Sequence, residues 1–347
     1  MALTWAGFMR RREFIAGLTA AVAVAPVGLA RAQTRNPAPL KRIALVHPTE
    51  KPAGMTIDGR RTFKAFFTEL RRLSYVEDSN VIIDRFSGLG HSNQSDDLVA
   101  EVLAVKPDVI VALSGSLALR FKQKTATVPI VAPSSDPVAI GLVASMARPG
   151  GNVTGASVDG GFDLWGKRVQ LLSEIAGGRV TNVRFLLAAP VDWWEKSSAH
   201  IQADARRAGI SIAPMWLDQR IDRAAYERAY ATMMSDGVNG VVLFDSAEHI
   251  TNRKLIVDLA VEHRLPAIYP YREFVEVGGL LSYGVDLADV LRRLADITDK
   301  ILKGARPGDI PINQQVKFEL VLNKATAIAE GMTPPATLIA AADEIIE

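Results

Sequence analysis

The alternation of short apolar runs with helical patterns constrains the fold of this chain more than any other feature. The first half contains four almost continuously apolar runs, at residues 42–46, 81–83, 108–113 and 128–132. After the first run, the spacing of one helix face recurs in Phe63, Phe66, Phe67 and Leu70. Strands that are apolar on both faces, with amphipathic helices between them, are typical of a parallel sheet covered on both sides. The first half is therefore predicted to be a doubly wound α/β unit.

The pattern starts again after a break at residues 147–152, which are rich in Gly and Pro. A helix is predicted at 164–175, and four further apolar runs follow at residues 183–188, 210–214, 238–244 and 266–269. The last predicted elements are a strand, a helix and a strand, at 278–283, 287–302 and 316–322. The 315 residues after position 32 exceed the ~250–300 at which a single core stops growing. The predicted fold class is α/β with two doubly wound parallel-sheet lobes.

The first 32 residues have the order of an export signal. Arg10, Arg11 and Arg12 precede an apolar stretch at 14–29, and small residues at Ala30 and Ala32 match a cleavage site. The apolar stretch has 16 residues, fewer than the ~20 that span a membrane. We therefore expect residues 1–32 to be an export signal that is cleaved near Ala32. The alternative is an N-terminal core helix over residues 10–29.

The export route and the translation start of this segment each have two alternatives. The sequence Arg11-Arg12-Glu13-Phe14-Ile15 resembles a twin-arginine signal, but Arg10 stands where Ser or Thr is usual. The general secretory route is therefore the alternative. Met1 and Met9 are alternative translation starts.

Composition excludes several classes of partner and site. The chain has 40 Lys and Arg against 38 Asp and Glu, and the first 32 residues hold four of the former and one of the latter. The remaining chain therefore has a net charge of −1, which gives no support to a nucleic-acid partner. The chain has no Cys, which excludes a disulfide, a thiolate metal site, a Cys nucleophile and a lipoprotein anchor. We expect a soluble periplasmic protein, and a monomer.

Small polar residues follow the predicted strands at the edge where the loops of a parallel sheet converge. Small molecules bind beyond the carboxyl ends of such strands, and helix N-termini there attract anions such as a carboxylate. The residues that we expect to bind a ligand are Ser114, Gly115, Ser116, Ser134, Ser135, Asp136, Trp193, Asp245 and Tyr271.

Each of these residues has a purely structural alternative. The serines are favoured helix N-caps, and a cap and a ligand contact are compatible. Asp245 is either an N-cap or an acceptor for a ligand ammonium, and Asp136 before Pro137 is either a second acceptor or part of a turn. Trp193 and its neighbour Trp194 either stack on a flat ligand or pack within their own lobe. The guanidinium of Arg272 either pairs with a ligand carboxylate or is solvated.

The motifs of common enzymes are incomplete. Residues 155–159 begin like a nucleophile elbow but lack the final Gly, and Gly88-Leu89-Gly90 lacks the rest of a dinucleotide fingerprint. The five histidines have no metal-ligand spacing. We expect no enzyme activity, no cofactor and no metal.

Several segments together resemble the family of ABC-transporter substrate-binding proteins of the tryptophan/tyrosine type. They occur in the family's order and are Asp136-Pro137-Val138, ARPGGNVTG at 147–155, HRLPA at 263–267 with Tyr269-Pro270, GGLLSYG at 278–284, ILKGA at 301–305 and KFELV at 317–321. The resemblance covers almost all of the chain after the leader.

The resemblance implies a type I periplasmic-binding fold, in which two lobes are joined by three crossovers and close on a ligand. Mapped onto this chain, the crossovers are expected near 154–158, 272–280 and 310–316. The N-terminal lobe would then hold residues 33–155 and 281–312, and the C-terminal lobe 156–280 and 313–347. The resemblance also implies no cofactor, and an ABC permease of the inner membrane as partner.

The expected function is the solute-binding component of an ABC importer for an amino acid or similar small carboxylate, with aromatic ones favoured because of the tryptophans. One alternative is a periplasmic sensor subunit that reports its ligand state to a membrane kinase. A less favoured alternative is an exported hydrolase, for which no nucleophile and base are found. A transcription regulator of the same fold would need a helix-turn-helix where the leader stands.

Overall fold

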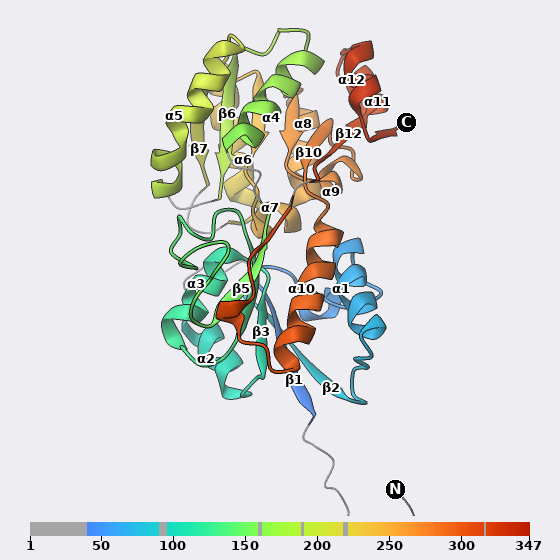
Figure 1. Cartoon of the computed structure of the whole chain (residues 1–347). Helices are drawn as coiled ribbons and strands as arrows, with labels where there is room; N and C mark the ends of the chain where they lie inside the picture. Colours follow the sequence, from blue (N-terminus) through green and yellow to red (C-terminus); the bar gives the residue numbers. More distant parts are fainter. Residues whose placement is uncertain (1–39, 90–95, 159–161, 189–190, 218–220, 316) are drawn as a thin grey trace, which may run out of the picture. The chain divides into compact units, whose positions relative to one another are not determined.

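Two parallel sheets, each covered by helices, form the body of the protein (Figure 1). The computed structural model describes residues 40–89, 96–158, 162–188, 191–217, 221–315 and 317–347, without the side chains of 162, 191–193, 196 and 197. No helix within these ranges is both long and apolar enough to cross a bilayer.

The first sheet has the strand order β11-β5-β4-β3-β1-β2, and every pairing in it is parallel. Its strands are β1 (Lys41–His47), β2 (Val81–Ser87), β3 (Val109–Ala112), β4 (Ile130–Ser134), β5 (Val153–Ser157) and β11 (Asn313–Gln314). The helices of this lobe are α1 (Arg61–Arg72), α2 (Asp96–Ala104), α3 (Gly115–Lys124) and α10 (Leu287–Leu302), with 3-10 turns η1 (Pro52–Gly54) and η2 (Pro307–Asp309).

Alternating residues of the first sheet face different helices. Ile43 and Leu45 of β1 pack in the core that contains the apolar faces of α1 and α10, which lie side by side (Figure 1). Ala44 and Val46 pack on the opposite face with α2 and α3. The period of two along β1 and the burial of both faces explain the continuous apolar run in the sequence.

The second sheet has the order β13-β12-β10-β9-β8-β6-β7. Its strands are β6 (Asn182–Leu187), β7 (Ser211–Trp216), β8 (Gly240–Leu243), β9 (Ala267–Tyr269), β10 (Leu281–Gly284), β12 (Glu319–Asn323) and β13 (Glu344–Ile346). The helices of this lobe are α4 (Phe162–Ile175), α5 (Val191–Arg207), α6 (Arg223–Ser235), α7 (Ala247–Thr251), α8 (Arg253–Glu262), α9 (Arg272–Val275), α11 (Lys324–Ala329) and α12 (Ala336–Ala341). All pairings are parallel except that of β10 with β12.

The predicted fold class is confirmed: the chain forms two doubly wound lobes and passes between them three times. The strand pairings place the passages differently from the expected lobe boundaries. Leu281–Gly284 was expected in the N-terminal lobe, but Leu281 pairs with Ile268 of β9, so the second passage lies at 285–286 rather than within 272–280.

The other two passages begin within the expected crossover ranges, but each lies two residues beyond the expected lobe boundary. Ala156 and Ser157 complete β5 of the first sheet, and Asn313 and Gln314 pair with them as β11. The first passage therefore follows Ser157 and the third follows Gln314. Because β12 returns from the other lobe, it enters the second sheet antiparallel to β10.

Candidate ligand-binding cavity

A cavity of about 540 Å³ lies between the carboxyl edges of the two sheets. Its volume is within the ~300–1,000 Å³ typical of small-molecule sites. Eight of the nine residues predicted from the sequence line it, namely Ser114, Gly115, Ser116, Ser134, Ser135, Asp136, Asp245 and Tyr271. The ninth, Trp193, has a side chain outside the described part. Trp194 is buried against Phe185, with ring centroids 5.5 Å apart, and packs within its own lobe.

The N-terminal wall of the cavity is built around the start of α3. Ser114 caps this helix, its Oγ accepting from the Leu117 N–H at 3.4 Å, and the hydroxyls of Ser114 and Ser116 lie 2.7 Å apart. A Cβ on Gly115 would come within 2.8 Å of the Ser134 Oγ, so glycine allows the helix start to approach β4. The wall therefore presents hydroxyls and helix N–H groups, which suit an anionic oxygen.

The end of β4 reaches across to the other lobe. The hydroxyl of Ser135 donates to the Oδ2 of Asp245 at 2.8 Å, and Asp245 is 8 % exposed. The Oδ1 of Asp136 accepts from the Ala139 N–H at 2.9 Å, which is the turn role named as its alternative. Asp136 nevertheless lines the cavity.

The C-terminal wall contributes further carboxyl groups that the sequence did not single out. Glu248 of α7 and Glu273 of α9 line the cavity and are buried. Burial raises the pKa of both carboxyls, and the guanidinium of Arg61 opposes this for Glu273 at 3.1 Å. Asp245 follows β8, so this wall is acidic where the opposite wall carries hydroxyls and N–H groups.

The end of β1 and the start of α1 supply a second group of residues missed from the sequence. His47, Arg60, Thr62 and Phe63 line the cavity beyond α3. Arg60 forms an ion pair with Glu50 at 2.5 Å and lies 5.2 Å from the centre of the Phe63 ring. The only sequence signal was the position of His47 as the last residue of an apolar strand.

The lobes are in contact around the cavity. The hydroxyls of Thr49 and Thr251 lie 2.6 Å apart, and the Ser135–Asp245 and Arg61–Glu273 contacts also cross between the lobes. Arg61 also pairs with Asp286, at 2.8 Å, in the second passage. The structure is therefore a closed arrangement in which the two walls share hydrogen bonds.

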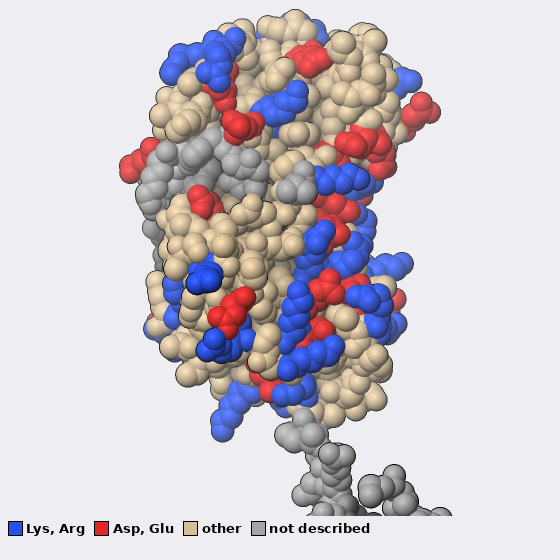
Figure 2. Space-filling view, viewed as in Figure 1, with Lys and Arg blue, Asp and Glu red and all other residues tan. Residues whose placement is uncertain are grey.

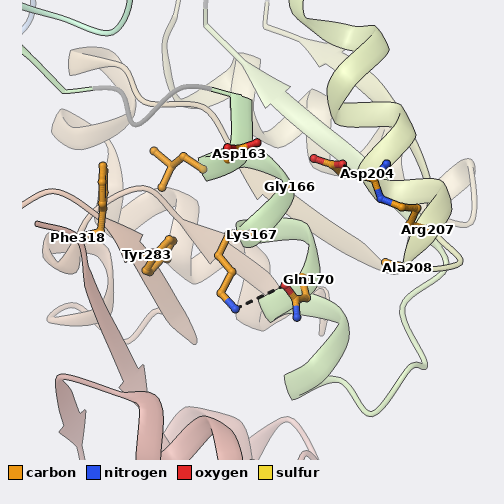
Figure 3. Close-up of a pocket in the computed structure, with 10 residues that line it drawn as sticks. Asp163, Gly166, Lys167, Gln170, Asp204, Arg207, Ala208, Tyr283 and Phe318 are labelled. Atoms are coloured by element: carbon orange, nitrogen blue, oxygen red, sulfur yellow. Dashed lines mark hydrogen bonds and ion pairs between the residues drawn. The ribbon is translucent and has the colours of Figure 1, made fainter. Parts of the chain in front are cut away.

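A second hollow of about 680 Å³ lies on the C-terminal lobe alone (Figure 3). Figure 3 shows Tyr283 and Phe318 at one side of it, Lys167 of α4 between, and the ion-paired Asp204 and Arg207 of α5 at the other side. None of the predicted ligand-binding residues lines this hollow. It also involves only one lobe, whereas the interlobe cavity joins the strand ends of both sheets.

Many charged side chains outside the cavity form ion pairs with each other. Figure 2 shows basic and acidic side chains interleaved over α10 and α1, where Arg292 pairs with Asp289 at 2.7 Å. Arg272 pairs with Glu319 and Glu344, at 3.3 and 2.6 Å, and is not among the residues that line the cavity. Within the described ranges, no cluster of three His, Asp or Glu side chains is arranged to hold a metal ion.

Comparison with known proteins gives the family. The family model described as ABC transporter substrate binding protein matches residues 58–346. A tyrosine-binding protein of Clostridioides difficile is 22 % identical over 277 residues, which are 78 % of this chain and 76 % of that protein.

Two solved structures share the fold. One is an ABC domain in complex with L-Trp from Streptococcus pneumonia, with a TM-score of 0.75 and 23 % identity over 88 % of this chain and all of that one. A conserved domain protein from Vibrio cholerae has a TM-score of 0.76 and 22 % identity over 88 % of this chain and 99 % of that one. With the family model matching most of its length, the chain belongs to the ABC transporter substrate binding proteins.

Proposed function

We propose that this protein is the solute-binding component of an ABC importer and captures an amino acid or similar small carboxylate, aromatic ones favoured, between its lobes. Membership of a substrate-binding family means that it binds its ligand without transforming it, and the family implies an ABC permease as partner. The interlobe cavity, lined by residues of both lobes, is the observation that carries the proposal.

The chemistry of the two walls supports a zwitterionic ligand. The Ser114–Ser116 hydroxyls and the α3 N-terminus suit a carboxylate, and Asp245 on the other wall suits an ammonium. A ligand that joins the two walls favours the closed arrangement, because it interacts with both lobes only when they are together. The ligand-binding residues in this proposal are the eight predicted residues that line the cavity.

The size of the cavity supports a ligand as large as an aromatic amino acid. A volume of 540 Å³ is within the ~300–1,000 Å³ of cavities that hold small organic ligands. An aromatic side chain would meet the apolar part of the lining, which includes Phe63, Phe244 and Leu291. The tyrosine-binding and tryptophan-bound relatives are consistent with this class.

Export completes the proposal. Residues 1–32 would direct the chain, by the twin-arginine or the general secretory route, to the periplasm, where it would act as a freely diffusing monomer. The absence of Cys leaves no site for a lipid anchor after cleavage. Import would then require the closed, loaded form to dock on the permease.

A titration panel tests the proposal. Isothermal titration with the twenty amino acids, small carboxylates, sugars and nucleosides should give saturable binding of one molecule for an amino acid or carboxylate. The Ser135→Ala variant should bind it about tenfold to a hundredfold more weakly, because a hydrogen bond to a charged group contributes ~1.5–3 kcal/mol. Ser235→Ala, at an exposed helix end, is the matched control. Binding of sugars or nucleosides alone would refute the ligand class.

A further inference from the structure

The hydrogen bonds of His47 indicate the orientation and the tautomer of its ring. Its Nδ1 accepts hydrogen bonds from the backbone N–H groups of Thr49 at 3.1 Å and Glu50 at 2.8 Å. A ring nitrogen that accepts cannot carry a proton, so the proton of the neutral ring is on Nε2. The ring also packs against Phe63, with centroids 6.1 Å apart at an angle of 58°.

The ring is neutral in the folded protein. Burial, with the neighbouring Arg60 guanidinium, lowers the pKa of His47 from 6.5 to about 3. At neutral pH, Nε2–H is therefore a hydrogen-bond donor without a positive charge. The side chain is 5 % exposed, and the residue lines the interlobe cavity.

Nε2 has no hydrogen-bond partner among the residues that the structure describes, and it is not one of the polar atoms fully sealed from solvent. This donor is therefore within reach of solvent, and a water molecule can accept from it when no ligand is bound. A ligand group in the cavity would satisfy this donor. His47 therefore has the properties of a binding contact whose partner is supplied by the ligand.

The position of His47 in the sheet separates it from the serines at the end of β4. β4, which ends at Ser134, is next to β3, and β3 is next to β1, which ends at His47. Two strand spacings are about 10 Å, whereas Ser114 and the start of α3 follow β3, one spacing from β1. A ligand whose carboxylate is held between α3 and the β4 serines would direct a group at its other end to His47.

We propose that His47 is a specificity-determining residue that donates, through Nε2–H, to an uncharged hydrogen-bond acceptor at the far end of the ligand, such as a hydroxyl or amide oxygen. This inference rests on the proposed function and narrows its ligand to small carboxylates with such a group. A second carboxylate is disfavoured at this end, because the neighbouring cation Arg60 is already paired with Glu50. Glu273 on the opposite wall would repel a second negative charge.

Paired ligands test the inference. The affinities of L-tyrosine and L-phenylalanine, and of L-glutamine and L-methionine, are measured by isothermal titration on the wild-type protein and on His47→Asn. The Asn Oδ1 can replace Nδ1 as the acceptor of the two backbone N–H groups, but its side chain does not reach the position of Nε2. His200→Asn, at an exposed position of α5, is the matched control.

In the pair that binds, the wild-type affinity for the acceptor-bearing ligand should exceed that for the other ligand by about fivefold or more. This ratio is the scale of one neutral hydrogen bond. In His47→Asn the ratio of the two affinities should fall to about one, and in the control it should be unchanged. Equal affinities in the wild type, or a preference that survives in His47→Asn, would overturn the inference and leave the proposed function intact. If no small carboxylate binds, the proposed function fails and the inference fails with it.

A second measurement follows the wild-type protein and needs the variant only to assign one resonance. In wild-type protein labelled with ¹⁵N-histidine, the Nε2–H resonance that is absent from His47→Asn spectra should shift when the acceptor-bearing ligand binds. A purely structural histidine would leave this resonance in place, which would also overturn the inference.

Discussion

Replacing His249 by Asn should make the protein less sensitive to acid. His249 is fully buried on α7, and its Nδ1 bonds to the carbonyl oxygen of Phe244 at 2.9 Å. Burial lowers its pKa from 6.5 to about 4. Between these two values the unfolded chain binds more protons than the folded one, so stability is fully present above pH 6.5 and is lost as the pH falls towards 4.

The magnitude follows from the pKa difference. For one such group, each pH unit below 6.5 lowers the free energy of unfolding by about 1.4 kcal/mol. At pH 5, His249 therefore lowers the free energy of unfolding by about 2 kcal/mol. The Asn side chain has no titrating group in this range, but its amide can still donate to Phe244. The variant should be less stable at pH 7 because it loses the ring packing against Tyr226, whose centroid is 5.9 Å away. The difference between wild type and variant should then shrink as the pH falls.

Urea unfolding followed by tryptophan fluorescence, at pH 7, 6 and 5, measures this difference. The gap in the free energy of unfolding between wild type and His249→Asn should narrow by about 2 kcal/mol from pH 7 to pH 5. His200→Asn, which changes an exposed histidine, is the control. A gap that stays constant within about 0.5 kcal/mol over this range would refute the argument that His249 is held neutral by burial.

Three further substitutions test the fold and its closure. Gly155→Ala should abolish folding, because its φ is +155° and a Cβ would lie 1.8 Å from the carbonyl oxygen of Ala132; a folded, soluble variant by circular dichroism would contradict this. Arg168→Lys should lower the stability by about 2 kcal/mol or more, since a buried guanidinium bonded at 2.7 Å to the carbonyl oxygen of Tyr283 is not replaced by an ammonium, and an unchanged melting temperature would count against it. Thr49→Val removes a hydroxyl pair that joins the lobes at 2.6 Å and should weaken ligand binding severalfold at unchanged melting temperature; an unchanged dissociation constant would show that this contact does not assist closure.

The cavity residues were predictable in part because one topological rule applies to them. Ser134 ends β4, and Ser114 and Asp245 lie two positions beyond the ends of β3 and β8. The carboxyl ends of parallel strands share one edge of a sheet. The local sequence therefore predicts that these residues lie at that edge, whatever the arrangement of the two lobes. Their roles in binding remain proposals.

The missed residues reach the cavity through contacts that no local pattern contains. Arg60 and Glu273 belong to the starts of helices on different lobes, and they share a cavity only because the lobes are closed. His47 was visible as a strand end, but its tautomer depends on the direction of two backbone N–H groups in the loop that follows. The second passage was misplaced for a similar reason, because Leu281 is equally apolar in either sheet and only its pairing with Ile268 decides between them.

The sequence by itself determined the class of fold and the edge at which a ligand would bind. Buried strands need continuous apolar runs, and amphipathic helices need apolar residues three or four positions apart. Both signals are local in the sequence. The tertiary structure decided which strand joins which sheet and which side chains face each other across the cleft. It also decided which ring nitrogen of His47 carries the proton. These depend on pairing, burial and hydrogen bonds between residues far apart in the chain, as in the contact between Ser135 and Asp245.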